Sequence, residues 1–190
     1  REILSLEEIS EIFDLSEINK AGAKFSWEKL NWINSQYIKN MESIKLIEIM
    51  RKYWDENGWE PPSQEWANKL AILIRDSMTL LKDSIDQSKP FFLIPTIQKE
   101  GQDFLENRES KLSLKLILNY LIEQNTIKLN KEKAKEIINE ISKMHNIKKG
   151  ILMKSLRVAF FGSLSGPDLI QSWELFAESK TDRTRIERCL

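Results

Sequence analysis

Gly150-Ile-Leu-Met-Lys-Ser-Leu-Arg-Val-Ala-Phe-Phe-Gly-Ser-Leu-Ser-Gly-Pro-Asp-Leu-Ile170 decides the fold that we expect for this chain. The first half is apolar apart from Lys154 and Arg157, which is typical of a helix packed along one side. In the Ser-Gly-Pro-Asp stretch at 165–168, Ser165 can cap a helix, the aspartate completes a capping box, and the proline suits a first turn. The pattern predicts a basic helix, a tight turn and a second helix start.

A binding site is expected at that turn. The free N–H groups of a helix start attract anions, and Lys154 and Arg157 would add positive charge beside them. This combination suits a phosphate or the polar edge of a base. The local pattern does not name the ligand.

The remaining sequence also predicts helices. Ser5, Ser26, Ser63 and Asn130 can each cap a helix, because apolar residues recur after them at three- or four-residue spacing. Beyond the two helices that follow Ser5 and Ser26, we expect helices at about 42–55, 64–84 with a bend, 96–106, 110–124, 131–146, 151–160, 166–178 and 182–189. Gly150 is expected to close the turn before 151–160. Since no alternating pattern persists, the predicted fold class is all-α and multihelical.

An internal boundary is predicted at Lys89-Pro-Phe-Phe-Leu-Ile-Pro95. Two prolines five residues apart cannot both lie in one continuous helix, and the aromatic residues between them need a surface on which to pack. We therefore expect a junction between subdomains near this segment.

Composition is that of an ordinary soluble globular protein. The 190 residues are 41% hydrophobic and 31% charged, enough to bury one or two cores. No apolar run approaches the ~20 residues of a membrane span, and no signal peptide is visible. Cys189 is the only cysteine, which excludes an intramolecular disulfide and fits the cytoplasm. Because the chain begins with Arg1, we interpret it as a piece of something longer.

The formal net charge is zero, but residues 128–157 are strongly basic. The cations in this stretch are Lys128, Lys131, Lys133, Lys135, Lys143, Lys148, Lys149, Lys154 and Arg157, and the acids are Glu132, Glu136 and Glu140. The stretch could supply an electrostatic field for a polyanion. It could also be a solvated helix face with compensating pairs, which the pattern alone favours.

Tryptophans can stack on unpaired bases, but helical spacing places most of these in the core. We expect Trp27, Trp54, Trp66 and Trp173 to be buried, and Trp59, beside two prolines, is undecided. His145 is the sole histidine, so one chain cannot assemble the usual zinc cluster of nitrogen and sulfur ligands. No Gly-rich phosphate loop is present.

Two segments carry a resemblance to a known family. The 150–170 stretch resembles the Leu-Met-Lys-Pro-Leu-Arg-Val-Ala-Leu-Thr-Gly-Ser and Gly-Pro-Asp-Leu run in the anticodon-binding region of bacterial glutamyl-tRNA synthetases. Lys24-Phe-Ser-Trp-Glu-Lys-Leu-Asn-Trp-Ile-Asn-Ser-Gln-Tyr-Ile38 is similar to the family signature Phe-Asp-x-x-Lys-Leu-x-Trp-x-Asn-x-x-Tyr-Ile. The matches occur in family order, and residues 40–145 between them are only loosely similar.

The resemblance implies the C-terminal part of such an enzyme. Residues 1–40 would end its stem-contact region, and 41–92 and 93–190 would be two helical subdomains of the anticodon-binding cage of a class I aminoacyl-tRNA synthetase. The partner would be the anticodon loop of the tRNA for glutamate, bound by a cytoplasmic monomer without a membrane. The complete enzyme would use ATP and Mg²⁺, whereas this chain lacks the His-Ile-Gly-His and Lys-Met-Ser-Lys-Ser signatures and would be inactive and cofactor-free alone.

The resemblance also implies the binding residues. Those assigned to the anticodon are Arg157, Lys154, Gly166, Pro167, Leu169 and Arg75, and those assigned to phosphates are Lys148 and Lys149. Arg157 aligns with a family arginine near the anticodon, although an arginine here could instead snorkel from a buried helix and cap nearby carbonyls. Arg75 is a weak candidate, because Ser77 occupies the position where some members carry a discriminating arginine.

The sequence departs from the family at Ser155, where proline is common, and at Phe161, where threonine is frequent. Local geometry before the turn is therefore expected to differ. Alternative interpretations are a helical scaffold that binds an acidic protein and the similar cage of class I lysyl-tRNA synthetases.

Overall fold

The computed structural model describes residues 3–14, 16, 22, 24–124 and 128–190. Over these residues it contains eleven helices and no strand, which confirms the all-α prediction. The helices are α1 (Leu6–Ile12), α2 (Trp27–Asn40), α3 (Ser43–Glu56), α4 (Gln64–Arg75), α5 (Asp83–Phe92), α6 (Lys99–Leu105), α7 (Arg108–Glu123), α8 (Lys131–His145), α9 (Lys149–Phe161), α10 (Leu169–Glu178) and α11 (Asp182–Glu187). No helix among them is long and apolar enough to cross a membrane.

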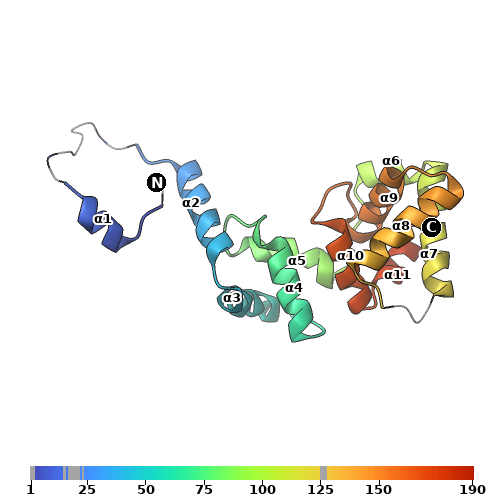
Figure 1. The fold of residues 1–190 in the computed structure, drawn as a ribbon, viewed down its shortest axis with the longest axis horizontal. Helices are drawn as coiled ribbons and strands as arrows, with labels where there is room; N and C mark the ends of the chain where they lie inside the picture. The colour runs from blue at the N-terminus through green and yellow to red at the C-terminus, as the bar shows by residue number, and fades with distance from the viewer. Residues whose placement is uncertain (1–2, 15, 17–21, 23, 125–127) are drawn as a thin grey trace.

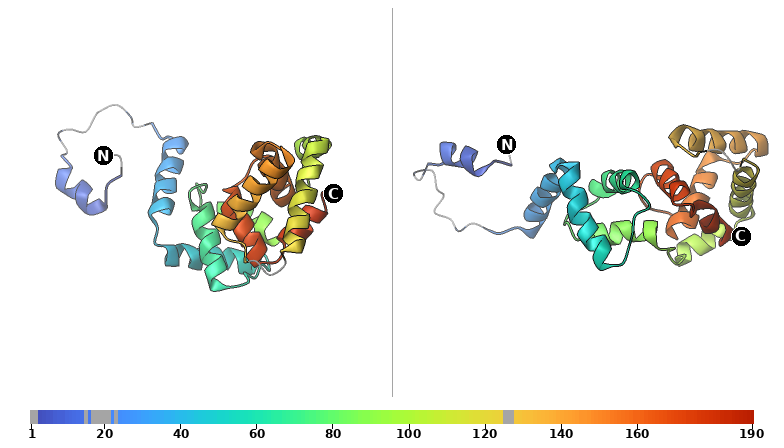
Figure 2. Two further views of the ribbon diagram at one scale, coloured as in Figure 1. Left: turned by 45° about the vertical axis from the view of Figure 1, so that its right-hand side comes forward. Right: turned by 90° about the horizontal axis from the view of Figure 1, so that it is seen from below.

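The molecule is elongated, with three groups of helices that follow one another along the long axis (Figure 1). Helices α1 and α2 lie at one end, α3 to α5 form a middle group, and α6 to α11 form a compact body at the other end. Two further views agree that α1 and α2 stand apart from this body (Figure 2). Parts of the expected stem-contact region, residues 1–2, 15, 17–21 and 23, lie outside the described residues.

Four of the predicted capping residues cap their helices. The side chains of Ser5, Ser26, Ser63 and Asn130 each accept a hydrogen bond from the backbone N–H three residues later. Each bond satisfies one of the N–H groups that a helix start leaves without an intrahelical partner.

The prediction of one bent helix over 64–84 is wrong. Helix α4 ends at Arg75, and a new helix begins at Asp83. The Asp83 carboxylate accepts hydrogen bonds from the backbone N–H groups of Thr79 and Leu80, at 2.9 and 2.7 Å. An acidic side chain thus folds back on the turn before its own helix and separates α5 from α4.

Gly150 does not close a turn, because α9 begins at Lys149 and includes it. Asn146 ends α8 instead, with a φ of 53°. Asparagine is among the few residues that adopt this left-handed conformation readily, and it commonly ends helices.

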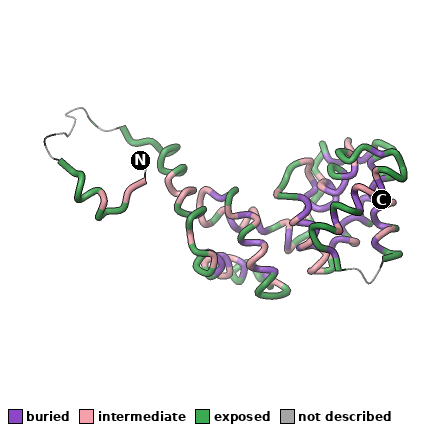
Figure 3. Tube along the Cα trace, in the orientation of Figure 1, coloured by how far each residue is buried: buried purple, intermediate pink, exposed green. Residues whose placement is uncertain are grey.

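Three of the four tryptophans predicted in the core are buried. Trp54 and Trp173 are fully buried and Trp66 is 1% exposed, whereas Trp27 is 70% exposed and its prediction is wrong. Ile38 is the only buried residue of α2 among those described, since most of this helix extends away from the other helices (Figure 3). Trp59, which the sequence left undecided, is 8% exposed and stacks on Phe92.

The middle group and the compact body are joined by polar contacts, of which one is buried. The Trp66 indole of α4 donates to the Leu175 carbonyl of α10 at 2.9 Å. Lys69 of α4 lies 3.0 Å from the Glu174 carboxylate and 2.6 Å from that of Glu178. These contacts raise the pKa of Lys69, chiefly through the hydrogen bond to Glu178. Helices α4 and α10 are therefore held together at their interface.

Candidate functional site

The candidate site begins where α9 ends. Gly162 ends this helix with a φ of 69°, and its N–H donates to the Val158 carbonyl at 2.8 Å. A Cβ at this position would lie 2.2 Å from the Thr96 carbonyl oxygen, and the Gln98 N–H donates to the Gly162 carbonyl at 2.8 Å. Only glycine fits here, because both the backbone conformation and the neighbouring chain exclude a side chain.

The helix after the turn begins later than predicted. Asp168, not Ser165, caps α10, and its carboxylate accepts from the Gln171 N–H at 2.9 Å. The Ser165 hydroxyl lies 3.1 Å from that of Ser163 instead. Pro167 precedes the helix rather than lying in its first turn. An acid followed three residues later by glutamine is itself a capping pattern, so the sequence did contain this signal.

Arg157 reaches from α9 to the turn. It is half-buried, and its Nη1 donates to the carbonyls of Gly166 and Pro167, both at 2.9 Å. The predicted alternative, in which this arginine caps nearby carbonyls, is therefore part of its role. Within the described part of the chain, Nε and Nη2 have no hydrogen-bond partner. Donors thus remain for a ligand beside the turn.

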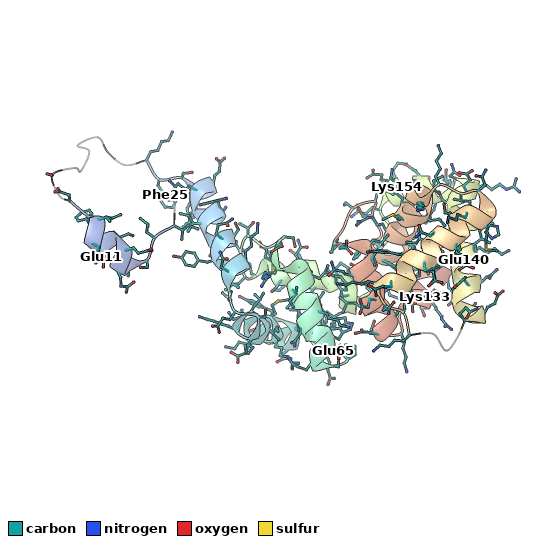
Figure 4. All side chains as sticks on the ribbon, in the orientation of Figure 1. Glu11, Phe25, Glu65, Lys133, Glu140 and Lys154 are labelled. Atoms are coloured by element: carbon teal, nitrogen blue, oxygen red, sulfur yellow. The ribbon has the colours of Figure 1, made fainter. Side chains whose placement is uncertain are left out.

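The other predicted residues of the turn differ in accessibility. Gly166 is exposed and Pro167 is half-buried. Leu169 is 2% exposed, so its side chain belongs to the core and only its backbone can meet a ligand. As the first residue of α10, Leu169 has an N–H without an intrahelical acceptor. Lys154 is exposed one turn before Arg157, on the upper side of the compact body (Figure 4).

Lys148 and Lys149 lie at the start of α9 and are exposed. The first turn of this helix contains no acid. Two cations at the positive end of a helix dipole are electrostatically unfavourable for the helix. Folding therefore gives no reason for this pair, whereas a bound phosphate would.

The structure does not join Arg75 to the turn. Arg75 ends α4, and its Nε lies 3.9 Å from the carboxylate of the adjacent Asp76. No hydrogen bond or ion pair among the described residues connects it with 163–168. Its assignment to the anticodon stays a prediction.

The basic stretch 128–157 contains both lysines paired with acids and lysines without an acidic partner in the described structure. Lys133 lies 3.0 Å from the Glu136 carboxylate and above the Tyr120 ring, and the hydrogen bond to Glu136 raises the pKa of Lys133. From Lys143 onward the stretch contains no acid. The ion pair that the structure shows within this stretch, Lys133–Glu136, is thus in α8, and the uncompensated charge extends from Lys143 along α9.

Comparison with known proteins gives a family match over residues 45–190, to the anticodon binding domain. The chain is 97% identical over 190 residues to the glutamate–tRNA ligase of Prochlorococcus marinus strain AS9601 and 46% identical over 189 residues to that of strain NATL2A. Both matches cover the whole of this chain but 40% of the relative, so the chain spans less than half of the length of these relatives.

Solved structures share the fold. A glutamate tRNA ligase from Elizabethkingia meningosepticum CCUG26117, in complex with its amino acid, matches with a TM-score of 0.90 and 28% identity, over all of this chain and 37% of the other. A glutamate-tRNA synthetase from Elizabethkingia anophelis matches with a TM-score of 0.87 and 29% identity, covering 36% of that chain. The residues around the turn lie within the matched region.

Proposed function

This chain belongs to the anticodon binding domain family, and from that premise we propose that it holds the anticodon loop of the tRNA for glutamate. The observation that carries the proposal is the turn at 163–168. There a half-buried arginine with free donors, exposed backbone and the start of α10 meet, and the exposed Lys154 lies one helical turn before the arginine on α9. Such a surface offers donors for base edges and charge for phosphates.

The recognition follows from how single-stranded loops are read. Bases in a loop can be splayed, so that their edges reach side chains and backbone groups. Arg157 and the N–H of Leu169 would meet a base, because both present donors without a partner in the described structure. Lys148, Lys149 and Lys154 would neutralise phosphates, which fix the position of the RNA without reading its sequence.

We further propose that the chain works within a glutamate–tRNA ligase, which attaches glutamate to tRNA with ATP. ATP and Mg²⁺ are assigned to the part of the ligase that this chain does not span, and no residue here is assigned to either. Residues 41–92 and 93–190 would act as the two anticodon-binding subdomains, after the end of the stem-contact region at 1–40. A cytoplasmic monomer is the proposed form.

Binding of an anticodon stem-loop RNA tests the proposal. The chain should bind the stem-loop of the tRNA for glutamate more tightly than one whose anticodon bases are substituted, as measured by fluorescence anisotropy. Arg157→Ala should weaken binding of the matched loop by about 1 to 3 kcal/mol, the range for losing a charge-assisted hydrogen bond. Binding of the base-substituted loop should weaken much less.

The double variant Lys148→Ala, Lys149→Ala is the matched control. It should weaken both loops equally and lower the slope of log K against log salt by about 0.7 for each phosphate that the variant no longer neutralises. Circular dichroism must show that both variants stay folded. Equal binding of the two loops by the unmodified chain would refute anticodon recognition, and absence of RNA binding would leave an acidic protein partner as the better interpretation.

A further inference from the structure

The backbone of the turn rests on an aromatic ring. Gly166 has a φ of 155°, and a Cβ built there would lie 2.9 Å from Cδ2 and 3.1 Å from Cγ of Phe161. Protein Cβ atoms essentially never come closer than 3.0 Å to another heavy atom. The turn therefore lies closer to the Phe161 ring than a residue with a side chain would allow.

The ring has little room to move, because it is buried and packs against two other aromatic rings. Phe161 is 7% exposed, and its centroid lies 5.8 Å from that of Phe91 and 5.7 Å from that of Phe176. Phe91 and Phe176 stack on each other, with centroids 5.0 Å apart. Phe91 belongs to α5 of the middle group and Phe176 to α10, so the ring is supported by helices from both groups. Close-packed side chains of this kind transmit a displacement rather than absorb it.

A second support lies one helical turn away. Arg157 precedes Phe161 by four residues, which places both on one face of α9. Arg157 holds the carbonyls of Gly166 and Pro167 by hydrogen bonds, while the Phe161 ring contacts Gly166. Two hydrogen bonds and one steric contact thus fix the turn, in which Ser165 and Asp168 are exposed.

We propose that Phe161 is a positioning residue for anticodon recognition. Its ring, in contact with Gly166, fixes the position from which the backbone groups of the 165–168 turn meet the RNA. This inference rests on the proposed function. Phe161 touches no base itself. It acts through Gly166, and a change at the ring moves the groups that read the loop without removing any of them.

The test separates contact with the ring from backbone strain, because strain from the φ of 155° at 166 is the same whichever residue stands at 161. Gly166→Ala inserts a methyl group against the ring, and Phe161→Ala in the same chain removes Cγ and Cδ2, the two atoms that the methyl group would meet most closely. Gly58→Ala is the control for a positive-φ glycine away from the turn, because Gly58 has a φ of 67° and nothing lies within 4 Å of its Cβ position. Gly150→Ala is the control for a glycine in a helix with open space around it.

Affinities for the matched and the base-substituted stem-loop are measured for each variant at a temperature where circular dichroism shows it folded. Gly166→Ala should weaken the matched loop by about tenfold and lower the ratio between the two loops, since recognition groups must hold their geometry within about 0.5 Å. Adding Phe161→Ala should restore most of that loss. Both control variants should bind as the unmodified chain does.

The inference is overturned if the double variant binds no better than Gly166→Ala, or if Gly166→Ala binds as the unmodified chain does. Should Gly166→Ala not fold, Phe161→Ala alone decides: it should lower the ratio between the loops while the salt dependence stays unchanged, and an unchanged ratio refutes the proposal. If the unmodified chain fails to bind either loop, the proposed function itself has failed, which is a different result from loss in a variant.

Discussion

Replacing Trp66 with phenylalanine tests the contact that joins the middle group to the compact body. Trp66 is 1% exposed, and its indole N–H donates to the Leu175 carbonyl across the α4–α10 interface. The same carbonyl also accepts from the Ser179 N–H at 3.0 Å. It therefore keeps one partner after the substitution, and no buried carbonyl is left unpaired.

The expected cost follows from these contacts. Losing a hydrogen bond whose acceptor keeps another partner costs about 0.5 to 1.5 kcal/mol. The smaller ring leaves a cavity in a tightly packed site, which adds about 1 to 2 kcal/mol. We expect Trp66→Phe to lower the free energy of unfolding by about 1.5 to 3.5 kcal/mol in total.

Urea unfolding followed by circular dichroism at 222 nm measures the loss, and Trp59→Phe is the matched control. Trp59 is also buried and stacks on Phe92 with centroids 5.3 Å apart, but its indole N–H makes no hydrogen bond to a described residue. It should lose only the cavity contribution, about 1 to 2 kcal/mol. If both variants lose the same amount, the bond between α4 and α10 contributes nothing and the reasoning is wrong.

Two further predictions concern folding. Leu70→Ala should lower the free energy of unfolding by about 2 to 5 kcal/mol because Leu70 is fully buried, and the half-buried Leu73, changed to alanine, should lose clearly less; equal losses in urea unfolding would contradict the burial. Burial raises the pKa of Asp182 above its ordinary value of 3.8, so on raising the pH the unfolded chain loses this proton before the folded chain does. The contribution of the protonated carboxyl to stability is therefore lost as pH rises from 3.8 through the folded-state pKa. Asp182→Asn should remove that dependence, so the stability of the unmodified chain relative to the variant should fall over this range in urea unfolding at stepped pH, and a constant difference would show that Asp182 does not titrate there.

Features that depend on a few neighbouring residues were predictable from the sequence. A capping serine or asparagine bonds to an N–H three residues away, so Ser5, Ser26, Ser63 and Asn130 could be recognised without the fold. Helical periodicity is equally local and gave the fold class. The resemblance of 150–170 assigned Arg157 and Gly166 to one site. That assignment is also local, because only nine residues separate them.

Only the tertiary structure decided which helix faces are covered and what lies under the turn. Trp27 has the spacing of a core residue, yet it is exposed because most of α2 extends away from the other helices. Phe161 looked like a mere departure from a family pattern, and its role depends on Phe91, seventy residues earlier in the chain. Periodicity reports that a face is apolar, but burial and steric support arise from residues that are distant in sequence and meet only when the chain folds.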